Sequence, residues 1–375
     1  MTRYERCLAT LVGQPSDRAP IIGGWLCQED FLVTMSGVSR AEFWAEPKRH
    51  AIEAYRRAGA DAIVQFILPK RPDQSTEGVG GRATNFGRRA EPPEARFPTP
   101  DSVIEYVRSQ PSAEDVTRTF DRQATYDRYL TIMEQGIREM APMVWIPGHV
   151  CGCPEFMWYS SFGYANYFEA MITEPDAFDR FFAMLGERRR LQNTEFARVV
   201  RDHDFLPVVY CGEDICYSAG PMISPKLLSE IYFPHLKRAF EPLNEAGLKI
   251  VWHSDGYIMP IIADLIACGV DGFQGLEEDH GMSLAELAGM TNRDGEPLIL
   301  WGSVSVTSTL PHGSPDDVRA DVRRCLDIGA QRGRLFLAPS SSVGPEVPTE
   351  NIAEFFHHGI EHGGTAYRGR EAAFA

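Results

Sequence analysis

Short apolar runs recur along the chain, and each is followed by a segment with a helical pattern. The clearest is LKIVWHSDG at residues 248–256, where an apolar run stops abruptly at polar residues and a glycine. A continuous apolar run bounded by turn residues is typical of a strand that is buried on both faces. Seven more runs predict strands in the same way: residues 20–26, 61–68, 143–147, 207–211, 270–275, 298–302 and 335–338.

Helical patterns fill the intervals between these runs. Besides a short N-terminal helix, we predict helices at residues 40–58, 102–109, 113–140, 178–200, 225–247, 260–268 and 349–359. Ser224-Pro225 and Ser314-Pro315 are typical helix starts, because serine caps the N-terminus and proline suits the first helical position. Residues 69–100 are rich in Pro, Gly, Arg and Glu, and we interpret them as a hairpin or an active-site lid.

Eight strand–helix alternations predict an α/β fold of the (β/α)8 TIM-barrel type, as a single domain over residues 1–375. The alternative is an open, doubly wound sheet. No G-x-G-x-x-G sequence follows the first strand, which weakens the nucleotide-binding version of that alternative.

Polar side chains gather where the predicted strands end. In a parallel barrel these ends share one mouth, where catalytic residues lie. The mouth would then contain Asp30, His149, Cys151, Cys153, Glu213, Asp214, His253, Asp255, Glu277, Glu278 and the serines at 340–342. His253 and Asp255 are two residues apart, so they point the same way on an extended backbone.

A ring of histidine and carboxylates suits a divalent metal such as zinc. Each residue also has a purely structural interpretation. His253 could be a hydrogen-bonded packing residue, Asp255 could cap the following helix, and Glu213 or Asp214 could pair with an arginine.

The loop after the third strand, GHVCGCPEFMWY, has two interpretations. His149, Cys151 and Cys153 could hold zinc as soft ligands, although the spacing of common structural zinc sites is absent. Otherwise the loop lines a substrate pocket or plugs the barrel mouth, and its aromatic residues could stack on a planar substrate. We predict these substrate-binding residues: Trp25, His149, Cys151, Phe156, Trp158 and Tyr159.

Composition argues against several classes of protein. The formal net charge of −15 argues against nucleic acid, because phosphate binding requires a basic surface. No apolar run approaches the roughly 20 residues that cross a bilayer, and no signal peptide is evident. Eight cysteines in 375 residues are too sparse for a disulfide scaffold. We therefore expect a cytoplasmic protein without membrane contact, and a homodimer is an open alternative to a monomer.

Four segments of the C-terminal half resemble the uroporphyrinogen decarboxylase superfamily. They are GEDICYSAGPMISPKLLSEIYFPHLKR, AGLKIVWHSDGYIMPIIADLIACGVDGFQGLE, LWGSV with LPHGSPDDVRADV, and VPTENI. The resemblance covers roughly residues 143–363 and implies a TIM barrel. It also implies one of two activities: metal-free decarboxylation of uroporphyrinogen, or methyl transfer that involves a zinc and a corrinoid cofactor.

Departures from the superfamily patterns separate these activities. The decarboxylases carry an arginine-rich R-Q-x-G-R-Y segment after the first strand, where this chain has GGWLCQEDF. Thiol-specific zinc methyltransferases carry H-x-C after the fifth strand and a cysteine after the eighth. This chain has His253-Ser254-Asp255 and three serines at 340–342. Oxygen ligands leave zinc more Lewis-acidic than thiolates would, which suits an oxygen substrate.

The resemblance thus implies a methyltransferase that moves a methyl group from a small O-methyl donor, for example an aromatic methoxy compound, to a separate corrinoid protein. The corrinoid (cobalamin) would be carried by that partner, since the D-x-H-x-x-G loop is absent. We expect His253, Glu213, Asp255 and Glu277 as zinc ligands, and His253, Asp255 and Asp214 as catalytic residues. The alternatives are a metal-free decarboxylase or lyase of another substrate, which would use His253 and the carboxylates as acid and base, and a non-catalytic binding barrel.

Overall fold

The computed structural model describes residues 1–71, 97–330 and 333–371. The chain divides into two compact units. The first contains Met1–Arg89, Met133–Pro147 and Gly272–Ala375, and the second contains Ala90–Ile132 and Gly148–Asp271. The predicted hairpin or lid at residues 69–100 lies largely outside the described residues.

The described residues of the first unit include six parallel strands. β1 (Ile22–Gly23), β2 (Ala62–Val64) and β3 (Val144–Ile146) pair in that order. β8 (Gly272–Gln274), β9 (Ile299–Val304) and β10 (Leu335–Pro339) form a second run. A parallel bridge between Ile21 and Leu337 connects the two runs through β1 and β10.

Helices connect most of these strands, as expected because parallel strands need long connections. The label α marks α-helices and the label η marks 3-10 helices. In the first unit the helices are α1 (Arg3–Leu11), α2 (Glu29–Ser36), α3 (Arg40–Ala45), α4 (Pro47–Ala58), η3 (Glu278–His280), α14 (Leu284–Gly289), α15 (Thr309–His312), α16 (Pro315–Ala330) and α17 (Thr349–Glu371). Packing between α16 and α17 is extensive.

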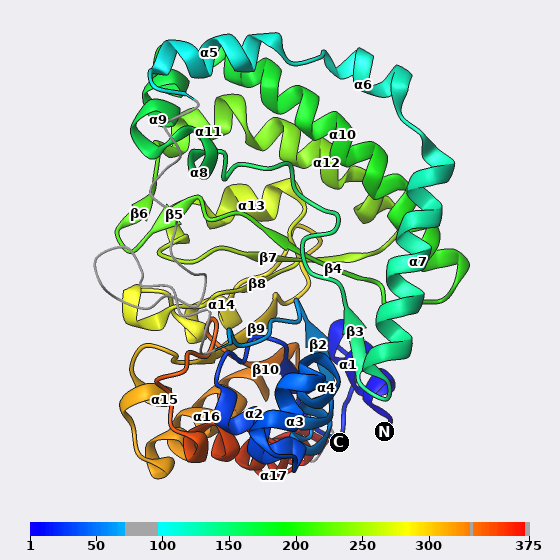
Figure 1. Cartoon of the computed structure of the whole chain (residues 1–375), viewed down its shortest axis with the longest axis vertical. Coiled ribbons are helices and arrows are strands. Elements are labelled where there is room, and N and C mark those ends of the chain that lie inside the picture. The colour runs from blue at the N-terminus through cyan, green and yellow to red at the C-terminus, as the bar shows by residue number, and fades with distance from the viewer. Residues whose placement is uncertain (72–96, 331–332, 372–375) are drawn as a thin grey trace. The chain divides into compact units, whose positions relative to one another are not determined.

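The second unit is built on two buried parallel strands, β4 (Val208–Gly212) and β7 (Lys249–His253). A small antiparallel hairpin follows β4 and consists of β5 (Cys216–Tyr217) and β6 (Gly220–Pro221). The helices of this unit are α5 (Pro100–Ser109), α6 (Ala113–Thr119), α8 (Tyr159–Phe162), α9 (Tyr164–Thr173), α10 (Pro175–Asp202), α11 (Pro225–Ile231), α12 (Phe233–Glu245), η2 (Met259–Ile261) and α13 (Ile262–Cys268), while α7 (Arg122–Met140) begins here and ends in the first unit. The long helices α10 and α12 pack side by side (Figure 1).

All eight predicted strands are present, but three predicted helices are each divided in two. The break between α3 and α4 falls before Pro47, and the break between α11 and α12 falls at Tyr232, shortly before Pro234. Proline lacks the N–H that a continuous helix needs, so each one starts a new helix. The break between α6 and α7 lies at Phe120, after which the Asp121 side chain accepts the N–H of Ala124 and caps the second helix.

Candidate metal site

The strands β4 and β7 end side by side. Their parallel register pairs Gly212 with His253, so the residues that follow both strands lie at one edge of the pair. Gly212 is required at this point because an added Cβ would collide with the backbone of His253. This close approach brings Asp214, two residues beyond Gly212, next to the end of β7.

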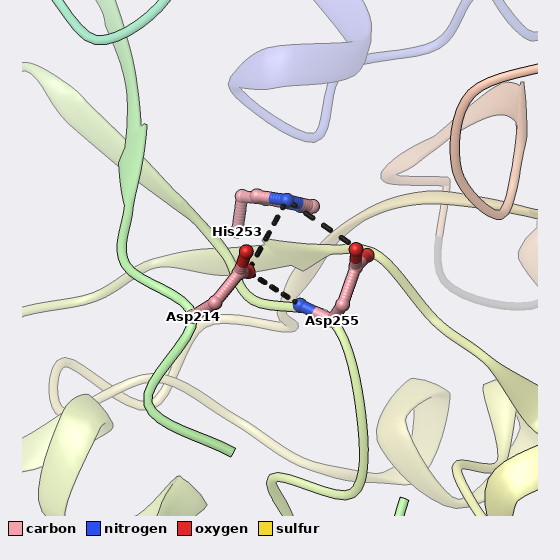
Figure 2. Close-up of side chains that lie close together, drawn as sticks. All are labelled: Asp214, His253 and Asp255. Carbon is pink, nitrogen blue, oxygen red and sulfur yellow. Dashed lines mark hydrogen bonds and ion pairs between the residues drawn. The ribbon is translucent and has the colours of Figure 1, made fainter. Parts of the chain in front are cut away.

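Three of the predicted residues converge here: Asp214, His253 and Asp255 (Figure 2). The Nε2 atom of His253 lies 3.8 Å from Oδ1 of Asp214 and 3.9 Å from Oδ1 of Asp255. The backbone N–H of Asp255 donates to Oδ1 of Asp214 at 3.0 Å. His253 is mostly buried, and both carboxylates are partly exposed. Within the described part of the chain, no other group of three His, Cys, Asp or Glu residues is as closely spaced.

These distances fit a shared cation better than direct hydrogen bonds. At 3.8 and 3.9 Å, the imidazole nitrogen and the carboxylate oxygens are too far apart to bond to one another. Zinc binds nitrogen and oxygen at about 2.0–2.2 Å, which separates two tetrahedral ligand atoms by about 3.4 Å. Three protein ligands of this kind leave a fourth position open for substrate, as in catalytic zinc sites.

The second nitrogen of His253 has an unusual environment. Nδ1 is buried and has no hydrogen-bond partner among the described residues. Zinc-binding histidines usually donate from the nitrogen that does not touch the metal. The three residues therefore match zinc in ligand type, and their ligand atoms are close together but more widely spaced than in a formed tetrahedral site. The orienting acceptor behind His253 is not supplied by a described side chain or backbone group.

Glu213 occupies a different environment from Asp214. Its Oε2 accepts the backbone N–H groups of Phe156 and Met157 at 2.9 and 2.8 Å. Burial raises the pKa of Glu213 to about 7, although these two N–H donors oppose the increase. Glu213 lies outside the three-residue group, and its oxygen is already used by the backbone of the loop after β3.

That loop also places His149 beside His253, with ring centroids 6.2 Å apart. His149 adopts a left-handed backbone conformation at φ 57°, and its N–H donates to the carbonyl of Tyr210. Burial lowers the pKa of His149 to about 4, so its ring is neutral at neutral pH. A neutral imidazole here adds no positive charge next to the candidate cation site.

The other predicted substrate residues of the loop vary in accessibility. Cys151 and Cys153 are buried, and burial raises the pKa of both thiols well above the usual value, so neither is a ready thiolate ligand. The ring of Phe156 is fully buried against Phe182 and Tyr232. Trp158 is half-buried and stacks on Phe162. Their contact with substrate stays a prediction.

The predicted substrate-binding residue Trp25 and the predicted ligand Glu277 lie in the first unit. Trp25 is buried and donates from Nε1 to the Gln65 side chain at 3.2 Å. Oε2 of Glu277 lies 3.3 Å from Nδ1 of His280. The role of Trp25 in substrate binding and that of Glu277 as a ligand both stay predictions.

One alternative for Asp255 is removed by the geometry. The next helical element, η2, begins at Met259 and has Ile258 at its N-cap position. Asp255 therefore does not cap it. Its carboxylate faces His253 instead.

Sequence patterns did not reveal the residues that hold the loop. The buried Asn193 of α10 accepts the N–H of Gly152 at 2.7 Å and donates to the carbonyls of Gly152 and Ala239 at 2.9 and 2.7 Å. The Tyr159 hydroxyl donates to the carbonyl of Asp214 at 2.9 Å. An asparagine inside a helical pattern and a tyrosine in an aromatic run carry no distinctive local signal, so only the tertiary structure identifies them.

Comparison with known proteins identifies the family to which this chain belongs. Residues 150–361, more than half of the chain, match the family described as uroporphyrinogen decarboxylase (URO-D). The chain belongs to this family. The family fold is a TIM barrel, which confirms the predicted fold class.

A solved structure agrees with this fold. A methyltransferase from Methanosarcina mazei is similar at 18% sequence identity and a TM-score of 0.61, over 96% of this chain and 99% of that chain. A hyperthermophilic endo-β-1,4-glucanase in complex with substrate matches at 11% identity over 92% and 94% of the two chains, but its TM-score of 0.29 supports no conclusion. No curated protein matches the chain. In the described residues, no helix is both long and apolar enough to cross a membrane.

Proposed function

We propose that this protein is a zinc-dependent methyltransferase that moves a methyl group from an O-methyl compound to a corrinoid carried by a separate protein. The observation that carries the proposal is the group formed by Asp214, His253 and Asp255 at the ends of β4 and β7. Its fold is also similar to that of a protein named as a methyltransferase.

The ligand chemistry favours an oxygen substrate. In this proposal Asp214 is the ligand from β4 in place of Glu213, because Oε2 of Glu213 already accepts two backbone N–H groups. Two carboxylates and a neutral imidazole would balance the charge of Zn²⁺ without any thiolate. When bound, zinc supplies Lewis acidity, which makes an ether oxygen a better leaving group.

The chain's own residues would orient the reactants. Asp255 is linked to Asp214 through its N–H, so the two carboxylates are held on the same side of His253. His149 and the rest of the loop after β3 lie beside this group and would receive the donor. An aromatic methoxy compound is the donor that we favour, because Trp158 of this loop is only half-buried and could stack on an aromatic ring.

Zinc content tests the ligand assignment. We expect the purified protein to bind one zinc per chain, and His253→Ala to lose zinc affinity by more than about 100-fold, since a lost ligand should cost more than a lost supporting hydrogen bond. The measurement is metal analysis with competition against a chelator. His235→Ala is the matched control, because His235 is equally exposed at 18% and also lies close to a carboxylate, 2.7 Å from Asp179, which is not one of the candidate ligands.

Activity tests the reaction. We expect the protein to methylate free cob(I)alamin with methoxyphenols as donors, and the change in the visible spectrum of cob(I)alamin measures this reaction. Addition of a chelator should abolish the activity. A protein that holds no zinc and is insensitive to chelator would contradict the proposal and favour the metal-free decarboxylase or lyase.

A further inference from the structure

Tyr159, the first residue of α8, reaches the end of β4. Its side chain is buried, and its hydroxyl donates to the carbonyl oxygen of Asp214 at 2.9 Å. The ring stacks on Tyr164 with centroids 4.5 Å apart, which fixes the direction in which the hydroxyl points. The hydroxyl therefore bonds to the main chain of a candidate ligand.

The same loop binds the preceding residue as well. Phe156 and Met157 donate their N–H groups to Glu213, so three contacts from residues 156–159 hold residues 213 and 214. The side chain of Asp214 is held separately, because its carboxylate accepts the N–H of Asp255. The main chain and the side chain of Asp214 are thus restrained by two separate segments of the chain.

We propose that Tyr159 is a positioning residue that fixes the main chain of Asp214 so that its carboxylate faces His253 and accepts the N–H of Asp255. This role differs from the substrate contact that the sequence predicts for Tyr159. The inference rests on the proposed function where metal affinity is measured, but the hydrogen bond between Asp255 and Asp214 gives it a readout that needs no metal.

The chain offers two matched controls. Tyr167 and Tyr232 are also buried tyrosines whose hydroxyls donate to carbonyls of this loop, those of Phe156 and Pro154, at 2.9 and 2.8 Å. Neither hydroxyl bonds to Glu213 or Asp214. Replacement of each tyrosine by phenylalanine removes one hydroxyl and leaves the ring, so we expect all three variants to fold with similar small decreases in Tm, about 2–4 °C.

The first measurement is zinc affinity by competition with a chelator. We expect Tyr159→Phe to weaken zinc binding by about 10-fold, as is common when a group that supports a ligand is removed. Tyr167→Phe and Tyr232→Phe should change it by less than about 2-fold. An equal loss in all three variants would overturn the inference, because the hydroxyls would then contribute only to the stability of the loop.

The second measurement is hydrogen exchange of the Asp255 amide in metal-free protein. We expect this amide to exchange at least about 10-fold faster in Tyr159→Phe than in wild type and the two controls, because the acceptor on Asp214 is no longer held in place. Unchanged exchange would overturn the inference. If wild type binds no zinc, the proposed function fails, whereas the exchange rate still decides the role of Tyr159.

Discussion

Glu213 and Asp214 show how two adjacent acids acquire different chemistry. Glu213 is partly buried, accepts two backbone N–H groups and has a pKa raised to about 7 by desolvation of its carboxyl group. Asp214 is partly exposed and faces the imidazole of His253. Sequence reasoning could identify the pair as candidates but could not choose between them, because the choice depends on a loop more than 50 residues earlier in the chain.

Gly212 controls the spacing of the candidate ligands at the scale of a single residue. An added Cβ would collide with the N, C and O atoms of His253, so the ends of β4 and β7 would have to separate. We expect Gly212→Ala to destabilise the protein by about 2 kcal/mol or more, through strain between backbones that cannot move aside, and to weaken zinc binding.

Urea unfolding and zinc titration measure the two effects. Gly289→Ala in α14 is the control, because no atom lies within 4 Å of an added Cβ and alanine favours helix, so stability should be unchanged or slightly higher. A Gly212→Ala protein with wild-type stability and zinc affinity would show that the close approach is not needed.

At the scale of elements, the sequence predicts strands better than helix boundaries. Each apolar run became a parallel strand because a strand buried on both faces must be apolar along its length. The hairpin of β5 and β6 was missed, since each strand has two residues and leaves no periodic signal. The sequence pattern also does not predict the short helices α2, α8, α9, α14 and α15, and it places no helix start at Pro47.

A buried acid connects three helices of the second unit. Glu187 of α10 accepts the hydroxyl of Thr117 from α6 at 2.8 Å and pairs with Arg190 and with Arg238 of α12. Burial alone would raise the pKa of Glu187, but Arg190, Thr117 and Arg238 hold it below the ordinary value. This network therefore stabilises the packing of α6, α10 and α12 only while the carboxylate is charged.

The pH dependence of stability follows from the lowered pKa of Glu187. A lowered pKa gives stability that is fully present above the ordinary glutamate pKa, about 4.3, and is lost as the pH falls through the lower folded value. We expect Glu187→Gln to cost about 1–2 kcal/mol at pH 7 and to show a shallower loss of stability than wild type between pH 5 and pH 3.

Urea unfolding over this pH range measures both changes. Glu230→Gln is the control, because the one ion pair that Glu230 forms among the described residues is an exposed one with Lys226 at 3.8 Å, and it should contribute less than about 0.5 kcal/mol. Parallel pH profiles for wild type and Glu187→Gln would contradict the assigned role of the network.

At the scale of the whole molecule, the three converging residues all belong to the second unit. A ligand that binds only the folded protein stabilises it in proportion to the logarithm of its concentration over Kd. We expect zinc at 100 times its Kd to stabilise wild type by about 2.7 kcal/mol, with a corresponding rise in Tm.

Calorimetry with and without zinc measures this shift. His253→Ala should show no rise in Tm, whereas His235→Ala should respond like wild type. An equal rise in His253→Ala would place the zinc elsewhere on the chain.

The hydrogen bond from Asp255 to Asp214 has a kinetic consequence for the proposed site. Because one carboxylate is anchored by the peptide group of the other, folding has already removed much of the freedom that ion capture would otherwise have to restrict. The association rate of the ion would then depend mainly on how fast the ion loses its hydration water. Differences in affinity among divalent ions would arise mainly from their dissociation rates.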